Sequence, residues 1–292
     1  MLKWRKPAPT PAVRAGLQMD GQGVTLATVD EGRVARVGRV ACGREGWRQG
    51  VDLLCRQLGV AKAAPVALVL PPDAYNLLLI EPPDVPDGEM KEAVRWRNRE
   101  LLSFPAEEAA IDVFRFPEDA QRGRRTVFVA AAHRTALSER IAAVLPTRLQ
   151  VVAIDITELS VRNLTELAGA APLAILQAAD GVGAITLVRG GDVYLSRRIE
   201  LSELDAERTI DQALLQLQRS LDYFENQLGQ GLASGVLVAL PAEVESAWMR
   251  RLQEMLPLPV HALSRWVEQT LGFRDIPSTT AAALGGALRA PS

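Results

Sequence analysis

A single structural unit recurs in this chain, and the recurrence limits the fold more than any other feature of the sequence. The first copy is predicted as three hairpinned strands, a helix and a strand, between about residues 12 and 70. The second copy has the same order between about residues 173 and 240. The segments GLQMDGQGVTL and ILQAADGVGAITL align the copies and place Gln18 opposite Gln177, an offset of 159 residues. A duplicated βββαβ unit predicts two similar lobes.

The strands of both copies are apolar or alternating runs bounded by turns that contain glycine. They are expected at Ala12 to Met19, Val24 to Val29, Arg33 to Ala41, Val66 to Leu70, Leu173 to Ala178, Gly183 to Val188, Val193 to Leu201 and Val236 to Leu240. Apolar residues at helical spacing predict a helix from Trp47 to Leu58 in the first copy and one from Asp205 to Gly229 in the second. Ser202 and Asp205 have the spacing of a capping box before that second helix.

A block of different pattern, from about Ala74 to Ile154, separates the two copies. It reads as strand, helix, strand, strand, helix, strand, which predicts a small inserted α+β subdomain. Within it, the polar run from Glu118 to Arg125 contains a glycine and is the expected mobile loop. The proline-rich residues from Met1 to Pro11 are expected to be a flexible tail.

The two helices of the inserted block have predicted boundaries. The first begins with Asp87 as N-cap and should turn Met90, Val94 and Leu101 inward. The second should run from about Thr135 to Leu145, because the next residue is a proline that closes the helix.

The composition is that of an ordinary soluble protein and excludes several functions. Of 292 residues, 48% are hydrophobic and 23% are charged, which is enough to bury the cores of two lobes. A net charge of −2 argues against a dedicated nucleic-acid binder, which needs excess cations to neutralise phosphates. No run approaches the roughly 20 apolar residues that span a bilayer, and no signal peptide is recognised, so we expect the chain in the cytosol.

Residues that commonly carry chemistry are scattered. Cys42, Cys55, His133 and His261 are isolated in sequence, so they predict neither a disulfide framework nor a metal site. The sequence contains no recognised nucleophile motif and no GxxxxGK[ST] phosphate loop. An enzymatic function would therefore rest on analogy of fold alone.

Several stretches of the sequence resemble the PilM family of type IV pilus assembly proteins. The first is EPPDVPDGEMKEAVRWRNRELLSFPAEEAAIDVF, a proline-flanked acidic helix, a turn and a strand bearing Asp112. The second is RLQVVAIDITELSVRNL, which contains Asp155. Two later segments are RSLDYFENQ and GGALR. The match runs from about Val13 to Arg289 and is most similar to the MSHA biogenesis (MshI) type of the family.

This resemblance implies the α/β, actin-like (ribonuclease H-like) fold with an insertion in the first lobe. The implied domains are a flexible tail at 1–11, the first lobe at 12–73, an inserted subdomain of the FtsA/PilM kind at 74–154, and a linking helix with the second lobe at 155–292. Members of the family lie at the cytoplasmic face of the inner membrane. The chain is therefore expected to be cytoplasmic and peripheral to that membrane.

In ATP-using relatives of this fold, an acidic residue ends the first strand of each lobe and holds hydrated Mg²⁺ or the attacking water. The corresponding residues here are Gln18 and Gln177, whose neutral amides neither balance a divalent cation nor act as a base. The family's first loop also carries a glycine and a lysine where this chain has Asp20 and Thr25. The resemblance therefore implies a degenerate ATPase without catalytic residues.

Further residues bear on whether a nucleotide still binds. Asp20 and Asp180, one in each loop, would oppose the charge of a triphosphate, or they are ordinary turn residues beside glycines. Gly285 and Gly286 correspond to the family's adenosine contact, but they would equally permit close helix packing. We expect no cofactor. If ATP binds at all, the expected site residues are Gln18, Asp20, Gln177, Gly285 and Gly286.

The implied partner is the short cytoplasmic tail of a bitopic inner-membrane protein of the PilN or MshJ type. The resemblance places that tail between the first lobe and the inserted subdomain. Lys91, Arg95 and Arg99 recur every four residues and form a basic stripe, interpreted either as a partner contact or as a solvated face. Leu2 to Arg5 combines apolar and cationic side chains and is expected to touch an anionic membrane only weakly.

The sequence thus predicts a non-catalytic scaffold of type IV pilus assembly, which contacts the assembly ATPase or platform indirectly. Two alternatives stay open. One is a nucleotide-hydrolysing actin-like protein of the same machinery. The other is an L-type platform protein of type II secretion, which is less favoured because such proteins continue into a transmembrane helix and this sequence shows none.

Overall fold

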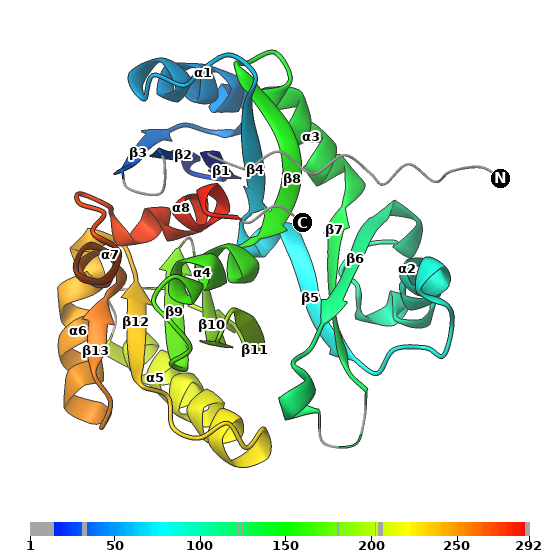
Figure 1. Cartoon of the computed structure of the whole chain (residues 1–292), viewed down its shortest axis with the longest axis vertical. Helices are drawn as coiled ribbons and strands as arrows, with labels where there is room; N and C mark the ends of the chain where they lie inside the picture. Colours follow the sequence, from blue (N-terminus) through cyan, green and yellow to red (C-terminus); the bar gives the residue numbers. More distant parts are fainter. Residues whose placement is uncertain are drawn as a thin grey trace.

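Two five-stranded sheets of equivalent strand order form the cores of two lobes in the computed structural model of the chain (Figure 1). The structure describes residues 15–30, 34–121, 123, 125–179, 181–201, 203 and 207–289. The predicted duplication is confirmed by the shared strand order. The tail at 1–11 with its membrane contact at Leu2 to Arg5, the loop residue Asp180, and the capping box of Ser202 and Asp205 lie outside the described residues.

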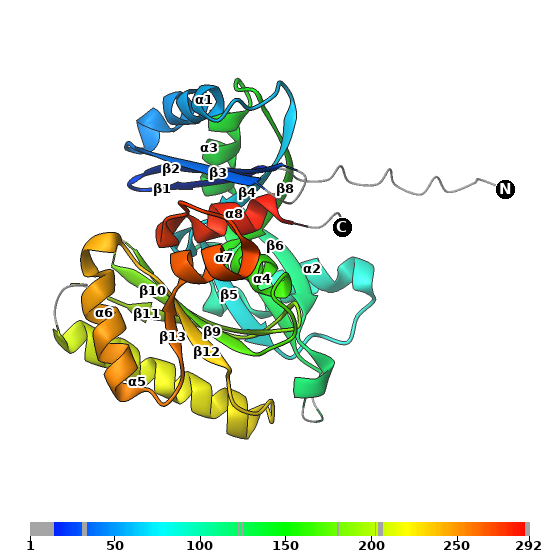
Figure 2. The ribbon, with the colours of Figure 1, turned by 60° about the vertical axis from the view of Figure 1, so that its left-hand side comes forward.

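The first sheet has the order β3-β2-β1-β4-β8. Its strands are β1 (Ala15–Asp20), β2 (Gly23–Asp30), β3 (Val34–Ala41), β4 (Ala64–Leu70) and β8 (Leu149–Ile156). Helices α1 (Trp47–Gln57) and α3 (Arg134–Val144) cover one face, and α8 (Ala281–Ala287) covers the other (Figure 2). Because both faces are covered, β1 is buried continuously from Ala15 to Met19 rather than on alternate residues.

The second sheet has the order β11-β10-β9-β12-β13. Its strands are β9 (Leu173–Ala179), β10 (Val182–Arg189), β11 (Asp192–Glu200), β12 (Gly235–Ala239) and β13 (Val260–Ala262). Its helices are α5 (Glu207–Asp222), which continues into a π-helical turn at Tyr223–Gln227, α6 (Ala242–Met255) and α7 (Leu263–Leu271). The apolar stripe of α5 is buried in the core of this lobe.

The register confirms the alignment of the two glutamines. Gln18 lies opposite Thr25 in the β1–β2 pair, and Gln177 lies opposite Ala184 in the β9–β10 pair. Each glutamine is therefore near the carboxyl end of the first strand of its lobe.

The inserted subdomain is a three-stranded sheet with one helix on it. Its elements are β5 (Tyr75–Ile80), α2 (Asp87–Arg97), β6 (Ala109–Arg115) and β7 (Val127–His133), in the sheet order β5-β7-β6. Met90 and Val94 of α2 pack on one face of this sheet. Phe128 on the opposite face joins the core of the second lobe.

The predicted boundary of the insertion at residue 154 is too far along the chain. Strand β8 pairs in parallel with β4, and α3 buries Val144 with Leu17 and Leu54 of the first lobe. Both elements therefore belong to the first lobe, and the subdomain spans β5 to β7. The sequence order of strands is the same in either case, so local pattern alone did not show which sheet β8 joins.

Three local expectations also differ from the structure. Pro86 holds the N-cap position of α2, and Asp87 is its first residue. Leu101 is 57% exposed, because the helix ends at Arg97 and the helical spacing no longer applies beyond it. Within the expected mobile loop, Glu118–Ala120 forms a 3₁₀ turn, and its Asp119 accepts hydrogen bonds from Tyr194 of the second lobe.

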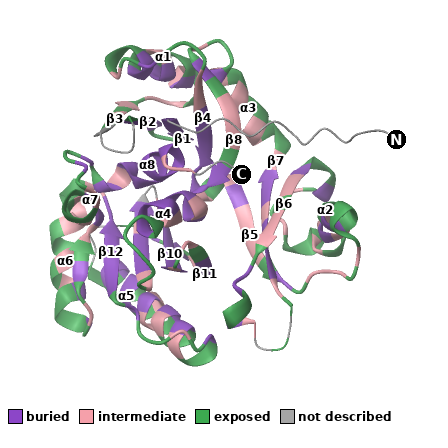
Figure 3. Ribbon diagram, in the orientation of Figure 1, coloured by how far each residue is buried: buried purple, intermediate pink, exposed green. Residues whose placement is uncertain are grey.

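Helices α4 (Thr157–Glu166) and α8 lie between the two lobes, where most residues are buried (Figure 3). Gly16 permits the close approach of β1 to α8, and Gly285 permits that of α8 to α4. A Cβ at Gly16 would lie 1.9 Å from the carbonyl oxygen of Ala283, and one at Gly285 would lie 1.8 Å from that of Ser160. The described residues contain no helix that is both long and apolar enough to cross a bilayer.

Candidate functional site

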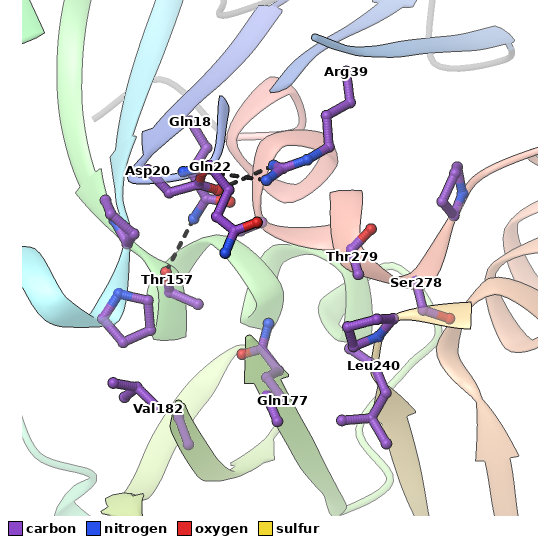
Figure 4. Close-up of a pocket in the computed structure, with 18 of the residues that line it drawn as sticks. Gln18, Asp20, Gln22, Arg39, Thr157, Gln177, Val182, Leu240, Ser278 and Thr279 are labelled. Carbon is purple, nitrogen blue, oxygen red and sulfur yellow. Dashed lines mark hydrogen bonds and ion pairs between the residues drawn. The ribbon is translucent and has the colours of Figure 1, made fainter. Parts of the chain in front are cut away.

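A cleft of about 740 Å³ lies between the two lobes, at the carboxyl ends of β1 and β9 (Figure 4). Gln18, Asp20 and Arg39 line it from the first lobe, and Gln177 lines it from the second. Thr157, at the start of α4, forms part of its floor. The fold thus brings together the predicted residues Gln18, Asp20 and Gln177.

The two glutamines are held differently. Gln18 is 7% exposed, and its amide nitrogen lies 3.4 Å from the hydroxyl oxygen of Thr157. That hydroxyl donates to the carbonyl oxygen of Leu70 at 2.9 Å. The amide oxygen of Gln177 is buried and has no hydrogen-bond partner among the described residues. Both side chains present neutral amides to the cleft, with no general base in either position.

Asp20 is a turn residue and also one half of an ion pair. Its Oδ1 accepts the backbone N–H of Gln22 at 2.9 Å, as turn-forming aspartates do. Its two carboxylate oxygens accept Nη1 and Nη2 of Arg39 at 3.0 and 3.2 Å. Of the two interpretations of Asp20, the turn residue is supported by its hydrogen bond to Gln22, and the guanidinium of Arg39 balances its negative charge.

Arg39 is a functional candidate that the sequence reading missed. Its Nη1 also donates to the hydroxyl of Thr25 at 2.9 Å. Thr25 lies opposite Arg39 in the β2–β3 pair, so the cation absent from β2 is supplied by the neighbouring strand. Counting the register back from the β2–β3 turn would have placed Arg39 beside Thr25.

A buried arginine, Arg140, donates a hydrogen bond to the backbone at the end of β1, next to Asp20. Arg140 of α3 is 4% exposed, and its Nε donates to the carbonyl oxygen of Met19 at 3.2 Å. Its guanidinium lies 4.9 Å from the ring centre of Trp47, whose indole N–H donates to the carbonyl oxygen of Asp20 at 3.0 Å. Burial lowers the pKa of Arg140. The only signal in the sequence was an arginine between Leu137 and Val144 on the inner face of a helix.

The charge of the cleft is negative. Its described lining has one guanidinium, on Arg39, and four carboxylates, on Asp20, Asp73, Glu243 and Glu245. Such a lining repels an oligophosphate unless metal ions compensate it. Within the described residues, no group of three or more potential ligand side chains is placed to hold a metal ion.

Gly285 and Gly286 do not line the cleft. Both are buried in α8, where a Cβ at Gly286 would lie 2.6 Å from a side-chain methyl of Val69. Of the two interpretations of this pair, close helix packing is the one that its surroundings support. Neither glycine is therefore retained as a candidate for cofactor binding.

Lys91, Arg95 and Arg99 do not form a continuous stripe. Lys91 pairs with Asp112 of β6 at 2.7 Å. Arg95 pairs with Glu92 of the same helix, and its side chain is only 18% exposed. Arg99 lies beyond the end of α2, in a 3₁₀ turn. The helical spacing that predicted a stripe therefore does not extend to Arg99.

Two duplicated lobes around a cleft, with a subdomain inserted in the first lobe, are the actin-like fold. No protein-family model matches the chain, and no curated protein matches its sequence. The structure is similar to a chain of a "PilM-PilN type IV pilus biogenesis complex", with a TM-score of 0.77 and 19% sequence identity. That match covers 96% of this chain and 99% of the other.

Two further solved structures are similar. One is a protein of unknown function with an actin-like ATPase fold from Bacteroides thetaiotaomicron, with a TM-score of 0.53, 7% identity, and 86% and 91% of the two chains covered. The other is the cytoplasmic domain of EpsL, an inner membrane component of the type II secretion system of Vibrio cholerae, with a TM-score of 0.51, 12% identity, and coverages of 94% and 95%. These likenesses confirm the predicted actin-like fold, in the form seen in the PilM-PilN structure.

Proposed function

We propose that the chain is a non-catalytic scaffold of type IV pilus assembly, of the MshI type within the PilM family. It binds the cytoplasmic tail of a PilN-like inner-membrane protein and reaches the assembly ATPase or platform through that partner. One observation carries the proposal: the fold matches a chain of the PilM-PilN complex over nearly the whole of both chains. On this proposal the chain works at the cytoplasmic face of the inner membrane.

The residues of the cleft support a role without hydrolysis. A metal-assisted phosphoryl transfer needs carboxylates to hold the metal and free cations to hold the phosphates. Gln18 and Gln177 offer amides, and Arg39 is already bound by Asp20. Protein binding is the function that such a chain can still perform.

We place the partner's tail at the junction of the first lobe and the subdomain. Strands β8 and β5 end their respective sheets in the described part of the chain, so each has one edge available for a further strand. Ile154 of β8 and Leu79 of β5 are 42% and 43% exposed. An extended peptide gains affinity by hydrogen bonding to such an edge and by placing alternate side chains against apolar ones.

Calorimetry with a synthetic peptide of the partner's tail tests this proposal. We expect a dissociation constant near the micromolar range, about 8 kcal/mol, which suffices once the membrane raises the local concentration. Ile154→Lys and Leu79→Lys should weaken binding. Met255→Lys, at a residue of the second lobe that is 46% exposed, is the matched control and should not. No binding at all would reject the scaffold role, and equal affinities in the three variants would reject the docking place.

The basic residues enter the same experiment as a separate comparison. Within the described residues Arg99 has no ion pair, whereas Lys91 and Arg95 are paired with acids of the subdomain. If a cation of this helix contacts the tail, Arg99→Glu should weaken binding more than Lys91→Glu. Equal and unchanged affinities would identify these residues as a solvated face.

A thermal-shift titration with millimolar Mg·ATP tests whether the protein binds a nucleotide, which hydrolysis would require. A ligand at 100 times its dissociation constant stabilises the native state by about 2.7 kcal/mol, which is readily measured. We expect no shift. A saturable shift that disappears in Thr279→Trp, a change in the cleft lining, would favour a nucleotide-hydrolysing protein instead.

The likeness to the EpsL cytoplasmic domain favours a second candidate, an L-type platform protein of type II secretion. The two candidates differ in their partner. Tighter binding of a tail peptide from a type II secretion partner than of a PilN-like tail would favour the second.

A further inference from the structure

The corner of the cleft formed by β1, β2 and β3 contains an arginine, Arg39, whose two terminal nitrogens both donate hydrogen bonds. Nη1 and Nη2 of Arg39 donate to the two oxygens of Asp20 at 3.0 and 3.2 Å. Nη1 donates in addition to the hydroxyl of Thr25 at 2.9 Å. Figure 4 shows Arg39 and Asp20 pointing toward each other at the upper edge of the cleft.

The two-pronged contact has the geometry with which a guanidinium binds either a carboxylate or a phosphate. The Asp20 side chain is 15% exposed and that of Arg39 is 33% exposed, so the pair is only partly screened by water. Thr25 is fully buried and holds the guanidinium in place independently of Asp20. The neighbouring Gly21 has open space where a Cβ would lie, so the turn itself leaves room beside the pair.

We propose that Arg39 forms a latent oligophosphate-binding site, which the carboxylate of Asp20 keeps occupied. Asp20 uses the same two donor nitrogens that a phosphate would use, so an approaching anion would have to displace its carboxylate. The chain therefore carries its own substitute for an anionic ligand. This inference goes beyond the proposed scaffold function and does not depend on partner binding.

The substitution Asp20→Asn tests the proposal. An asparagine keeps an oxygen that can accept the N–H of Gln22, so the turn is preserved while the charge is removed. The Arg39 guanidinium then keeps Thr25 and at most one contact with the neutral amide oxygen, so its charge is no longer balanced and is available to an anion. Inorganic tripolyphosphate and ADP, titrated separately by calorimetry at low ionic strength, distinguish a free oligophosphate from a nucleotide as the ligand.

Two further variants control the experiment. Asp73→Asn removes one negative charge from the same cleft without releasing Arg39, and so measures the effect of net charge alone. Asp20→Asn combined with Arg39→Gln removes the proposed donor. Unfolding temperatures without ligand show that each variant is folded.

We expect Asp20→Asn to bind tripolyphosphate at least about tenfold more tightly than the unmodified protein. We expect Asp73→Asn to change the affinity by less than about threefold, and the double variant to bind no better than the unmodified protein. Equal gains in Asp20→Asn and Asp73→Asn, no gain in Asp20→Asn, or a retained gain in the double variant would each overturn the proposal. Binding of the tail peptide should be the same in all three variants, so a failed scaffold function is recognised separately.

Discussion

The phenol hydroxyl of Tyr75 donates a hydrogen bond to Oε2 of Glu158, which lies 83 positions further along the chain. Both side chains are buried, at 2% and 4% exposure. The other oxygen of Glu158 accepts the hydroxyl of Ser196 at 2.8 Å. One carboxylate on α4 therefore joins β5 of the subdomain to β11 of the second lobe.

Replacing Tyr75 with phenylalanine should destabilise the protein by about 1–3 kcal/mol, because Oε2 of Glu158 is left buried without its donor. The free energy of unfolding in urea measures this loss. Tyr223→Phe is the control, since Tyr223 is 36% exposed, and it should change stability by less than about 0.5 kcal/mol. Equal effects of the two substitutions would mean that Glu158 does not depend on Tyr75.

Tyr194 gives the protein a pH dependence in the alkaline range. Burial and then its hydrogen bonds to Asp119 raise the pKa of Tyr194 to about 12. Its unfolded pKa is about 10, so the folded state favours the neutral phenol. The stabilisation is therefore fully present below about pH 10 and is lost progressively as the pH rises toward about 12.

The measurement is the free energy of unfolding at several pH values in that window. Tyr75 contributes a loss of the same sign, since burial and then Glu158 raise its pKa well above the ordinary value. The difference between the unmodified protein and Tyr194→Phe isolates Tyr194. The variant should lose stability less steeply with pH, and identical slopes would contradict this assignment.

Gly285→Ala should destabilise the protein by about 3 kcal/mol or more, because the new Cβ would lie 1.8 Å from the carbonyl oxygen of Ser160 and force α8 away from α4. Gly88→Ala is the matched control within another helix, where no atom lies within 4 Å of the added Cβ. That change should stabilise α2 by up to about 1 kcal/mol. Chemical denaturation of both variants checks the pair, and a tolerated Gly285→Ala would contradict the packing role.

The two lobes were predictable because their strands and helices carry regular apolar patterns that repeat along the chain. The place of β8 was not, because parallel pairing with β4 is decided by packing between elements far apart in sequence. Leu101 was assigned to a helix face because the apolar spacing continued past Arg97, where the helix ends. The apolar pattern of the sequence therefore predicted the helices and strands but not all of their boundaries.

Within the cleft, Gln18 and Gln177 were predictable because the repeat aligns them near the carboxyl ends of β1 and β9, and Asp20 because it ends β1. Arg39 was missed because its role depends on the cross-strand register with Thr25 rather than on its neighbours in sequence. Gly285 and Gly286 had two equally local interpretations, and only the approach of α4 and β4 decides between them. The roles of side chains that depend on contacts with a neighbouring strand or helix were thus not predictable from the order of residues in the sequence.

The last prediction concerns the two glutamines. Replacing both Gln18 and Gln177 with aspartate should not create ATPase activity. The added carboxylates supply potential metal ligands, but Arg39 stays bound by Asp20 and the cleft becomes more negative, so no free cation is available to hold the phosphates. Phosphate release with millimolar Mg·ATP should equal the background of the unmodified protein, and the unfolding temperature shows that the double variant is folded. Release above that background would show that the missing carboxylates alone prevent hydrolysis and that the Asp20–Arg39 pair is no obstacle to a nucleotide.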